Sequence, residues 1–172
     1  MLSAKEYPMV SVVIATYNCS SYITRAVQSA LDQTYPNVEV IVIDDGSTDN
    51  TPEILQSFRD RIRVVFQENR GPAAARNAGL AMAGGKYVAI LDADDYWLPE
   101  RLEKMISVLE DGPYDLLISN FYTVDEYYRR LTAGPAYDKL FCPPYKDQYK
   151  DILWRAYAFA MTVGKSELFR SQ

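Results

Sequence analysis

The sequence contains no histidine, and this is its most informative absence. Histidine is the usual general base near neutral pH and the commonest side-chain ligand of transition metals. Catalytic triads that depend on histidine are excluded at the same time. Any acid–base chemistry in this chain must therefore use carboxylates, lysine or tyrosine.

Cysteine is also scarce. The two cysteines, Cys19 and Cys142, lie far apart in the sequence and form no Cys-x-x-Cys spacing. This pattern argues against a disulfide framework and against a zinc site. We expect two free thiols.

The chain further lacks long hydrophobic runs and an excess of positive charge. Its longest apolar stretches, 10–15 and 38–43, are interrupted by Ser11 and Glu39, so we predict neither a transmembrane segment nor a signal peptide. Lysine and arginine total 18 against 23 for aspartate and glutamate, a net charge of −5 that argues against a nucleic-acid partner. A hydrophobic content of 48% over 172 residues indicates one globular domain, which we expect in the cytoplasm.

The sequence does contain apolar runs that alternate with amphipathic segments. Runs rich in Val, Ile and Leu predict buried strands, and apolar residues at three- and four-residue spacing predict helices between them. The expected strands cover 9–15, 38–43, 63–67, 87–91 and 115–119. The first two expected helices begin after a cap at Ser20 or Ser21 and after a cap at Thr51, which precedes Pro52. Two more begin at Pro72 and after Pro99, and a further helix covers 147–159. This order predicts an α/β fold with a doubly wound, mostly parallel sheet flanked by helices.

Carboxylates follow two of these strands at the point where each strand ends. Asp44 and Asp45 follow the second strand, and Asp92, Asp94 and Asp95 follow the fourth. The carboxyl ends of parallel strands lie at one edge of a sheet, where open α/β sheets bind ligands. Like charges about 4 Å apart repel by about 4 kcal/mol at an effective dielectric constant near 20, so such a cluster is stable only when it is solvated, partly protonated or bound to a cation. The sequence predicts an acidic crevice; the alternative is one helix-capping aspartate with the others solvated.

The residue types at this edge suit a nucleotide bound through a metal. Oxygen ligands without histidine or cysteine fit Mg²⁺ or Mn²⁺, which neutralises the charge that develops on a leaving diphosphate. Arg76 could add a second positive charge to the phosphates, or could be a surface residue. Asp45 could accept a hydrogen bond from a base ring, while Asp44 caps the turn that follows it. Thr16 and Tyr17 are placed to pack against a nucleobase at the end of the first strand.

Four motifs resemble the family 2 glycosyltransferases of the GT-A fold, in that family's order and spacing. They are 9–18 (Met-Val-Ser-Val-Val-Ile-Ala-Thr-Tyr-Asn), 42–49 (Val-Ile-Asp-Asp-Gly-Ser-Thr-Asp), 71–79 (ending Ala-Arg-Asn-Ala-Gly) and 91–98 (containing Asp-Ala-Asp-Asp). The similarity spans roughly residues 9–110. It is specific for fold and reaction class and carries almost no information about the sugar.

The resemblance implies a hexosyltransferase-type enzyme that moves a sugar from a nucleoside diphosphate sugar, preferably a UDP-sugar, to an acceptor hydroxyl with inversion. It implies Mn²⁺ or Mg²⁺, held by Asp94 and Asp95 of an Asp-x-Asp (DXD) element. It also implies a glycan or lipid-linked acceptor and polysaccharide or cell-surface glycan synthesis, and it is compatible with peripheral contact at the inner face of the membrane. The nucleotide-sugar-binding residues it implies are Thr16, Tyr17, Asn18, Asp45, Arg76, Asp92, Ala93 and Asp94.

Inversion also requires a catalytic base, and this chain offers no clear candidate for it. The base takes the proton of the acceptor hydroxyl, and in the family it is a carboxylate located after the segment that 161–169 matches. The chain ends at Gln172, and we reject the remaining carboxylates Glu167 and Asp125. We expect one domain over 1–172, with a nucleotide-sugar-binding half at 1–112 and the start of an acceptor half at 113–172, truncated before the base. The alternative is a short form whose base comes from elsewhere.

Two alternatives from other functional classes remain open. A nucleotide-sugar-binding or scaffold protein would bind the donor without turning it over. A phosphoacceptor receiver domain also combines a doubly wound sheet with aspartates and Mg²⁺, but it needs an acidic pair after the first strand and a lysine after the fifth. Thr16, Tyr17 and Asn18 follow the first strand here, and Asn120 and Phe121 follow the fifth.

Overall fold

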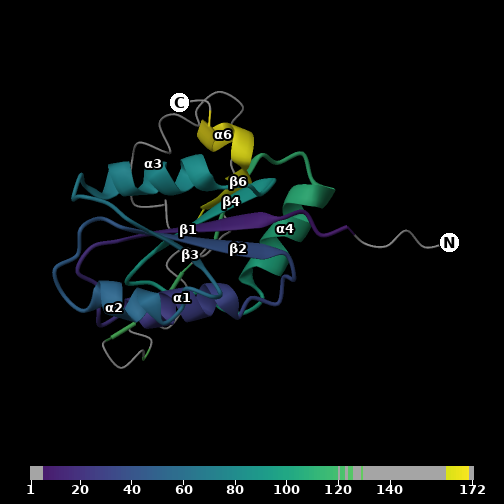
Figure 1. Ribbon diagram of the computed structural model, residues 1–172. Coiled ribbons are helices and arrows are strands. Elements are labelled where there is room, and N and C mark those ends of the chain that lie inside the picture. The colour runs from purple at the N-terminus through teal and green to yellow at the C-terminus, as the bar shows by residue number, and fades with distance from the viewer. Residues whose placement is uncertain (1–5, 120, 123, 126–128, 130–161, 171–172) are drawn as a thin grey trace.

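The computed structural model describes residues 6–119, 121–122, 124–125, 129 and 162–170. In this part of the chain six strands form one sheet, and helices cover both of its faces (Figure 1). The predicted α/β fold with a mostly parallel sheet is confirmed. The predicted helix at 147–159 and Cys142 lie outside the described residues.

The strands of the sheet are β1 (Val10–Thr16), β2 (Val38–Asp44), β3 (Arg63–Phe66), β4 (Tyr87–Asp92), β5 (Leu116–Ile118) and β6 (Thr162–Lys165). Their order across the sheet is β3-β2-β1-β4-β6-β5. β1 pairs in parallel with β2 and with β4, and β2 pairs in parallel with β3. β6 runs antiparallel to β4 and to β5. The five predicted strands agree with the structure to within one residue at each end, whereas β6 was not predicted as a strand.

Three helices lie on one face of the sheet: α1 (Ile23–Leu31), α2 (Thr51–Gln56) and α4 (Arg101–Asp111). The other face carries α3 (Pro72–Met82) and α6 (Ser166–Arg170), as Figure 1 shows. Alternate residues of β1 enter the two cores: Val12 and Ile14 pack with residues of α1 and α4, and Val13 packs with residues of α3. Burial on both faces explains why the central strands are continuous apolar runs.

The predicted caps of two helices are wrong. α1 begins at Ile23 after Tyr22, so neither Ser20 nor Ser21 is its cap. Thr51 is the first residue of α2, and Asn50 occupies the cap position without a side-chain cap bond. The polar groups near both helix starts instead form hydrogen bonds between the two loops, described below. Tertiary contacts therefore override the local capping preference.

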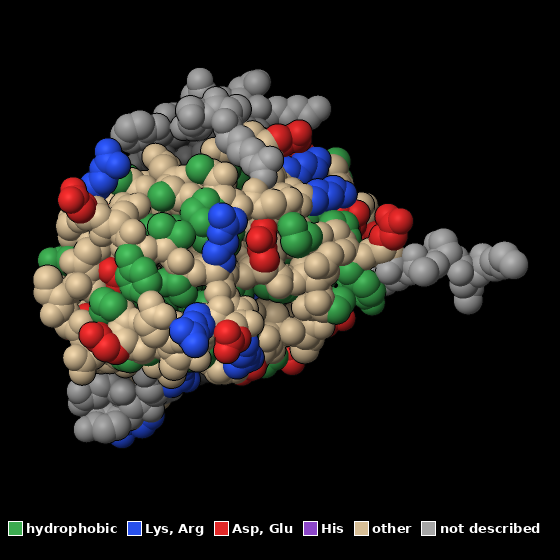
Figure 2. All heavy atoms as spheres, in the orientation of Figure 1, with side chains coloured by type: hydrophobic (Ala, Val, Ile, Leu, Met, Phe, Trp, Pro, Cys, Tyr) green, Lys and Arg blue, Asp and Glu red, His purple; other side chains and the backbone are tan. Residues whose placement is uncertain are grey.

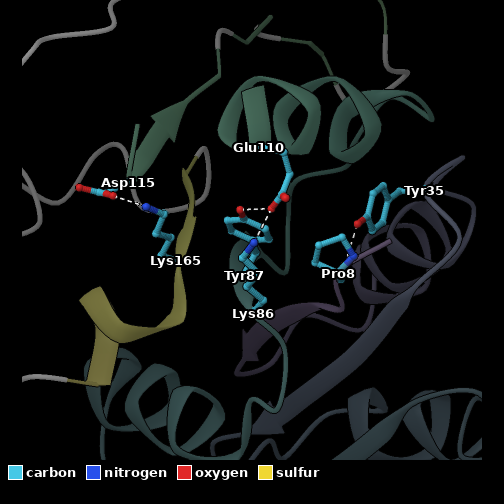
Figure 3. Close-up of polar contacts among 7 residues, drawn as sticks. All are labelled: Pro8, Tyr35, Lys86, Tyr87, Glu110, Asp115 and Lys165. Carbon is cyan, nitrogen blue, oxygen red and sulfur yellow. Dashed lines mark hydrogen bonds and ion pairs between the residues drawn. The ribbon is translucent and has the colours of Figure 1, made fainter. Parts of the chain in front are cut away.

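The edge of the sheet at which β1 and β4 begin is closed by a polar cluster (Figure 3). The Tyr87 hydroxyl donates to Glu110 of α4, and the Lys86 ammonium lies 2.7 Å from the same carboxylate oxygen. Hydrogen bonds from Lys86 and Tyr87 lower the pKa of Glu110 despite its partial burial. Lys165 of β6 pairs with Asp115 at 2.5 Å. We call Lys86, Tyr87 and Glu110 the amino-edge cluster, which joins β4 to α4.

Charged side chains of both signs are interspersed on the face drawn in Figure 2, without a large patch of one sign. Among the described residues, the helices are too short or too polar to cross a bilayer.

Candidate functional site

The register of the sheet brings the predicted acidic strand ends together. Thr16 of β1 lies opposite Asp44 of β2, and Ala15 lies opposite Asp92 of β4. Asp44 and Asp92 therefore end on either side of β1 at the same edge of the sheet. We call this the carboxyl edge. The predicted convergence of the two acidic strand ends is confirmed.

Asp44 has the turn-capping role that the sequence suggests. One of its carboxylate oxygens accepts a hydrogen bond from the backbone N–H of Ser47 at 2.7 Å. Between them Gly46 has a φ of +79°, and a Cβ there would lie 2.9 Å from the backbone nitrogen of Asn69. The second oxygen of Asp44 is buried and has no hydrogen-bond partner. Asp44 therefore supports the loop after β2 from inside.

Asp45 is almost fully buried, with 3% of its surface exposed. One oxygen accepts hydrogen bonds from Gln67 Nε2 at 2.6 Å and from the backbone N–H of Arg70 at 3.0 Å. The other oxygen accepts the backbone N–H of Gly71 at 2.8 Å. Burial alone would raise the pKa of Asp45, but these hydrogen bonds outweigh it and lower the pKa. Asp45 is therefore an ionised acceptor that also fixes the loop before α3.

Sequence reasoning missed the three partners of Asp45. Gln67 was predicted only as the end of the strand 63–67, and no contact between Asp45 and residues 70–71 was predicted. The hydrogen bonds from these three partners to Asp45 join positions that are 22 to 26 residues apart in the sequence. The pairing of Gln67 N with Asp44 O at 2.9 Å extends the β2–β3 ladder and places this loop beside Asp45. No local pattern in the sequence carries that information.

The two residues predicted to face a nucleobase differ in exposure. Thr16 is 4% exposed, and its hydroxyl oxygen is buried without a hydrogen-bond partner. Tyr17 is 48% exposed. Tyr17 is therefore accessible to a ligand at the carboxyl edge, while Thr16 lies within the end of the sheet. Asn18, the next residue, uses its side-chain oxygen for hydrogen bonds to the loop after β2.

Arg76 and Asp92 are brought together as an ion pair. Arg76 projects from α3, and its guanidinium lies 2.7 Å from a carboxylate oxygen of Asp92 at the end of β4. The close approach of α3 makes this possible, because a Cβ at Gly79 would lie only 2.4 Å from a methyl carbon of Val13 on β1. Arg76 is thus part of the carboxyl edge, and the surface-residue alternative is not supported.

Asp94 and Asp95 are exposed in the turn that follows β4, where Asp95 N–H donates to Asp92 C=O at 3.1 Å. Ala93 between them and the strand is 4% exposed. Although the residue as a whole is exposed, desolvation of its carboxylate by the surrounding protein atoms and the neighbouring charges of Asp94 and Asp92 raise the pKa of Asp95 to about 6. A bound cation would relieve this accumulation of like charge.

A metal at this turn would have to complete its shell with ligands from outside the protein. In the described ranges, no group of three or more His, Cys, Asp or Glu side chains is arranged to hold a metal. Asp94 and Asp95 alone fit Mg²⁺ or Mn²⁺, because such ions commonly use one or two carboxylates together with waters and substrate phosphates. The two carboxylates therefore fit the predicted cation when waters and phosphate oxygens complete its shell.

Neither rejected base candidate gains support. Lys165 lies opposite Tyr87, so Glu167, which follows β6, lies near the opposite, amino edge of the sheet. Asp125 forms an ion pair with Arg129 at 2.7 Å. Glu167 is thus too far along the sheet to act at the carboxyl edge. The described residues leave the base unassigned.

Comparisons with known proteins agree with this arrangement. A family model described as "Glycosyl transferase family 2" matches residues 11–171. The chain is also 40% identical over 121 residues to the Escherichia coli protein named UDP-Glc:alpha-D-GlcNAc-diphosphoundecaprenol beta-1,3-glucosyltransferase WfaP. That match covers 69% of this chain and 48% of WfaP. These matches favour the resemblance noted in the sequence over a receiver domain.

Two solved structures share the fold. The crystal structure of S. aureus TarS 1-349 in complex with UDP-GlcNAc has a TM-score of 0.74 and 26% identity, covering 94% of this chain and 46% of that one. Mannosyltransferase PcManGT from Pyrobaculum calidifontis, in complex with GDP-Man and Mn²⁺, has a TM-score of 0.63 and 30% identity. It covers 72% of this chain and 38% of that one. The chain thus spans less than half the length of WfaP and of each of these two structures.

Proposed function

This chain belongs to glycosyl transferase family 2, and from that premise we propose that it binds a nucleoside diphosphate sugar, preferably a UDP-sugar, at the carboxyl edge. The proposed reaction transfers the sugar to an acceptor hydroxyl with inversion. The observation that carries the proposal is the convergence of Asp45, the Arg76–Asp92 pair and the Asp94–Asp95 turn from separate elements at one edge. The TarS structure contains UDP-GlcNAc and the name of WfaP specifies UDP-Glc, and both support a UDP-sugar as the donor.

In this proposal, the loops after β1 and β2 hold the nucleoside. The exposed ring of Tyr17 offers an apolar face for a base. The Asp45 carboxylate stays ionised at neutral pH because its pKa is lowered. One Asp45 oxygen already accepts two hydrogen bonds and the other accepts one, so the second oxygen has a lone pair left for a base N–H. Thr16 supports the strand end from within.

The diphosphate would lie between Arg76 and the Asp94–Asp95 turn. Arg76 provides positive charge, and its pairing with Asp92 fixes the direction of its guanidinium. Asp94 and Asp95 would hold Mn²⁺ or Mg²⁺; when bound, this ion would neutralise charge on the departing diphosphate. The Mn²⁺ in the PcManGT complex supports this choice of cation.

The chemical step also needs a carboxylate that acts as the catalytic base. The acceptor oxygen forms a bond to the anomeric carbon from the face opposite the leaving group, and the bond from that carbon to the diphosphate oxygen breaks. The hydroxyl proton passes to a carboxylate base. The described residues of this chain supply donor binding and orientation, which can lower the barrier by fixing the reacting geometry.

The proposed acceptor is a glycan or lipid-linked saccharide used in cell-surface polysaccharide synthesis. The name of WfaP, which specifies a diphosphoundecaprenol-linked GlcNAc acceptor, supports this class. The nature of the sugar added is left to experiment.

Titration calorimetry with UDP, GDP and CDP, each with and without Mn²⁺, tests donor binding. We expect UDP to bind, and more tightly with Mn²⁺. Binding of none of the three nucleotides would overturn the proposed function. A second assay then measures hydrolysis and transfer of the sugar from the matching donor. Binding without either activity would support the nucleotide-sugar-binding or scaffold alternative.

A further inference from the structure

Two loops at the carboxyl edge are joined by a network of hydrogen bonds that the proposed function does not use. Asn18, in the loop after β1, donates its backbone N–H to the Ser47 hydroxyl at 2.9 Å. The side-chain oxygen of Asn18 accepts the backbone N–H groups of Thr48 at 2.8 Å and Asp49 at 3.3 Å. Asn18 therefore contacts three successive residues of the loop after β2.

A second set of bonds joins the same loops from the other side. The Thr51 hydroxyl accepts the backbone N–H of Cys19 at 3.0 Å, and the Asp49 carboxylate accepts that of Ser20 at 3.1 Å. Asp49 also accepts the Thr51 N–H at 2.9 Å. Hydrogen bonding by the Thr51 side chain is the main reason that the pKa of Asp49 is lowered. We call the side chains of Asn18, Ser47, Asp49 and Thr51 the interloop clamp.

Asn18 adopts a backbone conformation that other residues rarely tolerate. Its φ is +50°, and it is the one residue other than glycine with a positive φ in the described part of the chain. Asparagine enters the left-handed region more readily than most residues, whereas a β-branched residue would be strained there. The conformation directs its side-chain oxygen at the neighbouring loop. A local strain of this kind is maintained when surrounding contacts require it.

The clamp lies next to the two residues proposed to hold the nucleoside. Asn18 follows Tyr17 directly, and Ser47 lies two residues after Asp45. The backbone N–H of Asp45 also donates to the C=O of Thr16 at 2.9 Å, which extends the β1–β2 pairing up to the clamp. The distance between Tyr17 and Asp45 is therefore set by these contacts.

We propose that Asn18 and Thr51 are positioning residues, which hold Tyr17 and Asp45 at the spacing a nucleoside requires. In this view Asn18 acts through the loop after β2 and does not contact the nucleotide, although the family resemblance implies such a contact. The inference rests on the proposed function. Ordering two loops before binding removes an entropic cost that the ligand would otherwise have to meet.

The test uses variants that remove the clamp from each side. Asn18→Gly keeps the left-handed backbone and removes the acceptor oxygen, and Thr51→Val keeps the buried shape and removes the hydroxyl. Thr51→Ser restores the hydroxyl and is the conservative rescue. Asn50→Ala is the matched control, because Asn50 is exposed in the same loop and its side chain makes no cap bond. UDP affinity with Mn²⁺ is measured by calorimetry, at a temperature where thermal unfolding shows every variant folded.

We expect Asn18→Gly and Thr51→Val each to weaken UDP binding by about three- to tenfold, the effect of losing one or two hydrogen bonds. Thr51→Ser and Asn50→Ala should bind like the wild type. The double variant Asn18→Gly/Thr51→Val should be weaker than the wild type by much less than the product of the single effects, because both changes open the same clamp. A direct contact of Asn18 with the nucleotide would instead give multiplied effects.

The outcomes separate this inference from the proposed function. If the wild type binds no nucleotide, the proposed function fails. If the wild type binds UDP and both single variants bind it equally well, or if their effects multiply in the double variant, the positioning role is overturned while the proposed function stands.

Discussion

At the residue scale, the carboxyl edge contains aspartates whose pKa values are shifted in opposite directions. Hydrogen bonds outweigh burial and lower the pKa of Asp45 below the ordinary aspartate value of 3.8, whereas desolvation of its carboxylate and neighbouring charges raise that of Asp95 to about 6. Asp45 is thus a fixed, ionised acceptor, suited to recognition of an N–H group. The charge of Asp95 is disfavoured by its surroundings, and a bound cation would relieve this. The same residue type is therefore suited to two different proposed roles because its surroundings differ.

Asp45→Asn should weaken nucleotide binding by about tenfold or more and also lower the melting temperature. The substitution replaces an acceptor oxygen by an NH₂ group, so at least one of the N–H donors from Gln67, Arg70 and Gly71 loses its partner; a hydrogen bond to a charged group contributes about 1.5–3 kcal/mol. Calorimetry with UDP and thermal unfolding measure the two effects. Asp60→Asn is the control, since the Asp60 side chain is 96% exposed. Unchanged UDP affinity in Asp45→Asn would contradict the role of Asp45.

Asp95→Asn should slightly raise the stability of the metal-free protein at neutral pH. Because the folded-state pKa of about 6 lies above the ordinary aspartate value of 3.8, the folded state binds the proton more tightly than the unfolded state. Ionised Asp95 is therefore destabilising, with an effect that grows from pH 4 to 6 and is complete above pH 6. We expect the melting temperature to rise by about 1–3 °C at pH 7.5 and to stay unchanged at pH 4. A lower melting temperature at pH 7.5 would oppose this explanation.

Asp95→Asn should also remove most of the pH dependence of Mn²⁺ binding. In the wild type, protons compete with the cation for Asp95, so Mn²⁺ affinity in the presence of UDP should fall between pH 7 and pH 5.5. The measurement is a calorimetric titration at each pH. The same decline in the variant as in the wild type would assign the pH dependence to another group.

At the scale of secondary-structure elements, packing of α3 and β4 determines where the proposed site residues lie. α3 approaches the sheet closely at Gly79, three residues after Arg76, and so brings Arg76 to Asp92. β4 carries Asp92 at one end and Tyr87 at the other. Its far end is held by the amino-edge cluster rather than by the site. Stability and ligand binding are therefore separable along this strand.

Gly79→Ala should destabilise the protein and weaken nucleotide binding together. The added Cβ would lie 2.4 Å from a methyl carbon of Val13, and overpacking of this kind costs about 1–3 kcal/mol, partly offset by about 1 kcal/mol of helix propensity. Thermal unfolding and UDP calorimetry detect both effects. The double variant Gly79→Ala/Val13→Ala should be more stable than the sum of the two single losses predicts. Strict additivity would show that the two side chains do not compete for the same space.

Glu110→Gln should lower stability while leaving UDP affinity unchanged. Lys86 and Glu110 are partly exposed, so their ion pair contributes below about 1 kcal/mol, and the Tyr87 hydroxyl bond contributes about as much. Because the pKa of Glu110 is lowered from 4.5, its contribution is present above pH 4.5 and is lost as the pH falls through the folded-state pKa. The stability difference between the variant and the wild type should therefore shrink on acidification. A changed UDP affinity would show that the two edges are coupled.

At the scale of the whole molecule, much of the fold followed from local patterns in the sequence. Apolar runs and helical periodicity located β1 to β5 and the helices between them. The expected parallel β-α-β connections placed Asp44 and Asp92 at one edge of the sheet. The antiparallel β6 was missed because a strand of four residues is too short to show a period-2 pattern. The caps at Ser20 and Thr51 were wrong because their polar groups serve another loop.

The candidate site was predictable in its composition but not in its internal contacts. The acidic strand ends identified Asp45, Asp92, Asp94 and Asp95 without coordinates. The partners of Asp45, the Arg76–Asp92 pair and the interloop clamp depend on register and on helix placement, so they became visible only in three dimensions. Long-range hydrogen bonds of this kind leave no signal in a single sequence.

The most direct test is a crystal structure of this chain soaked with UDP and Mn²⁺. We predict density for the nucleotide at the carboxyl edge, with the base beside Tyr17 and Asp45 and with the cation between the diphosphate and the Asp94–Asp95 turn. A nucleotide bound elsewhere, for example against the amino-edge cluster of Lys86, Tyr87 and Glu110, would contradict the account.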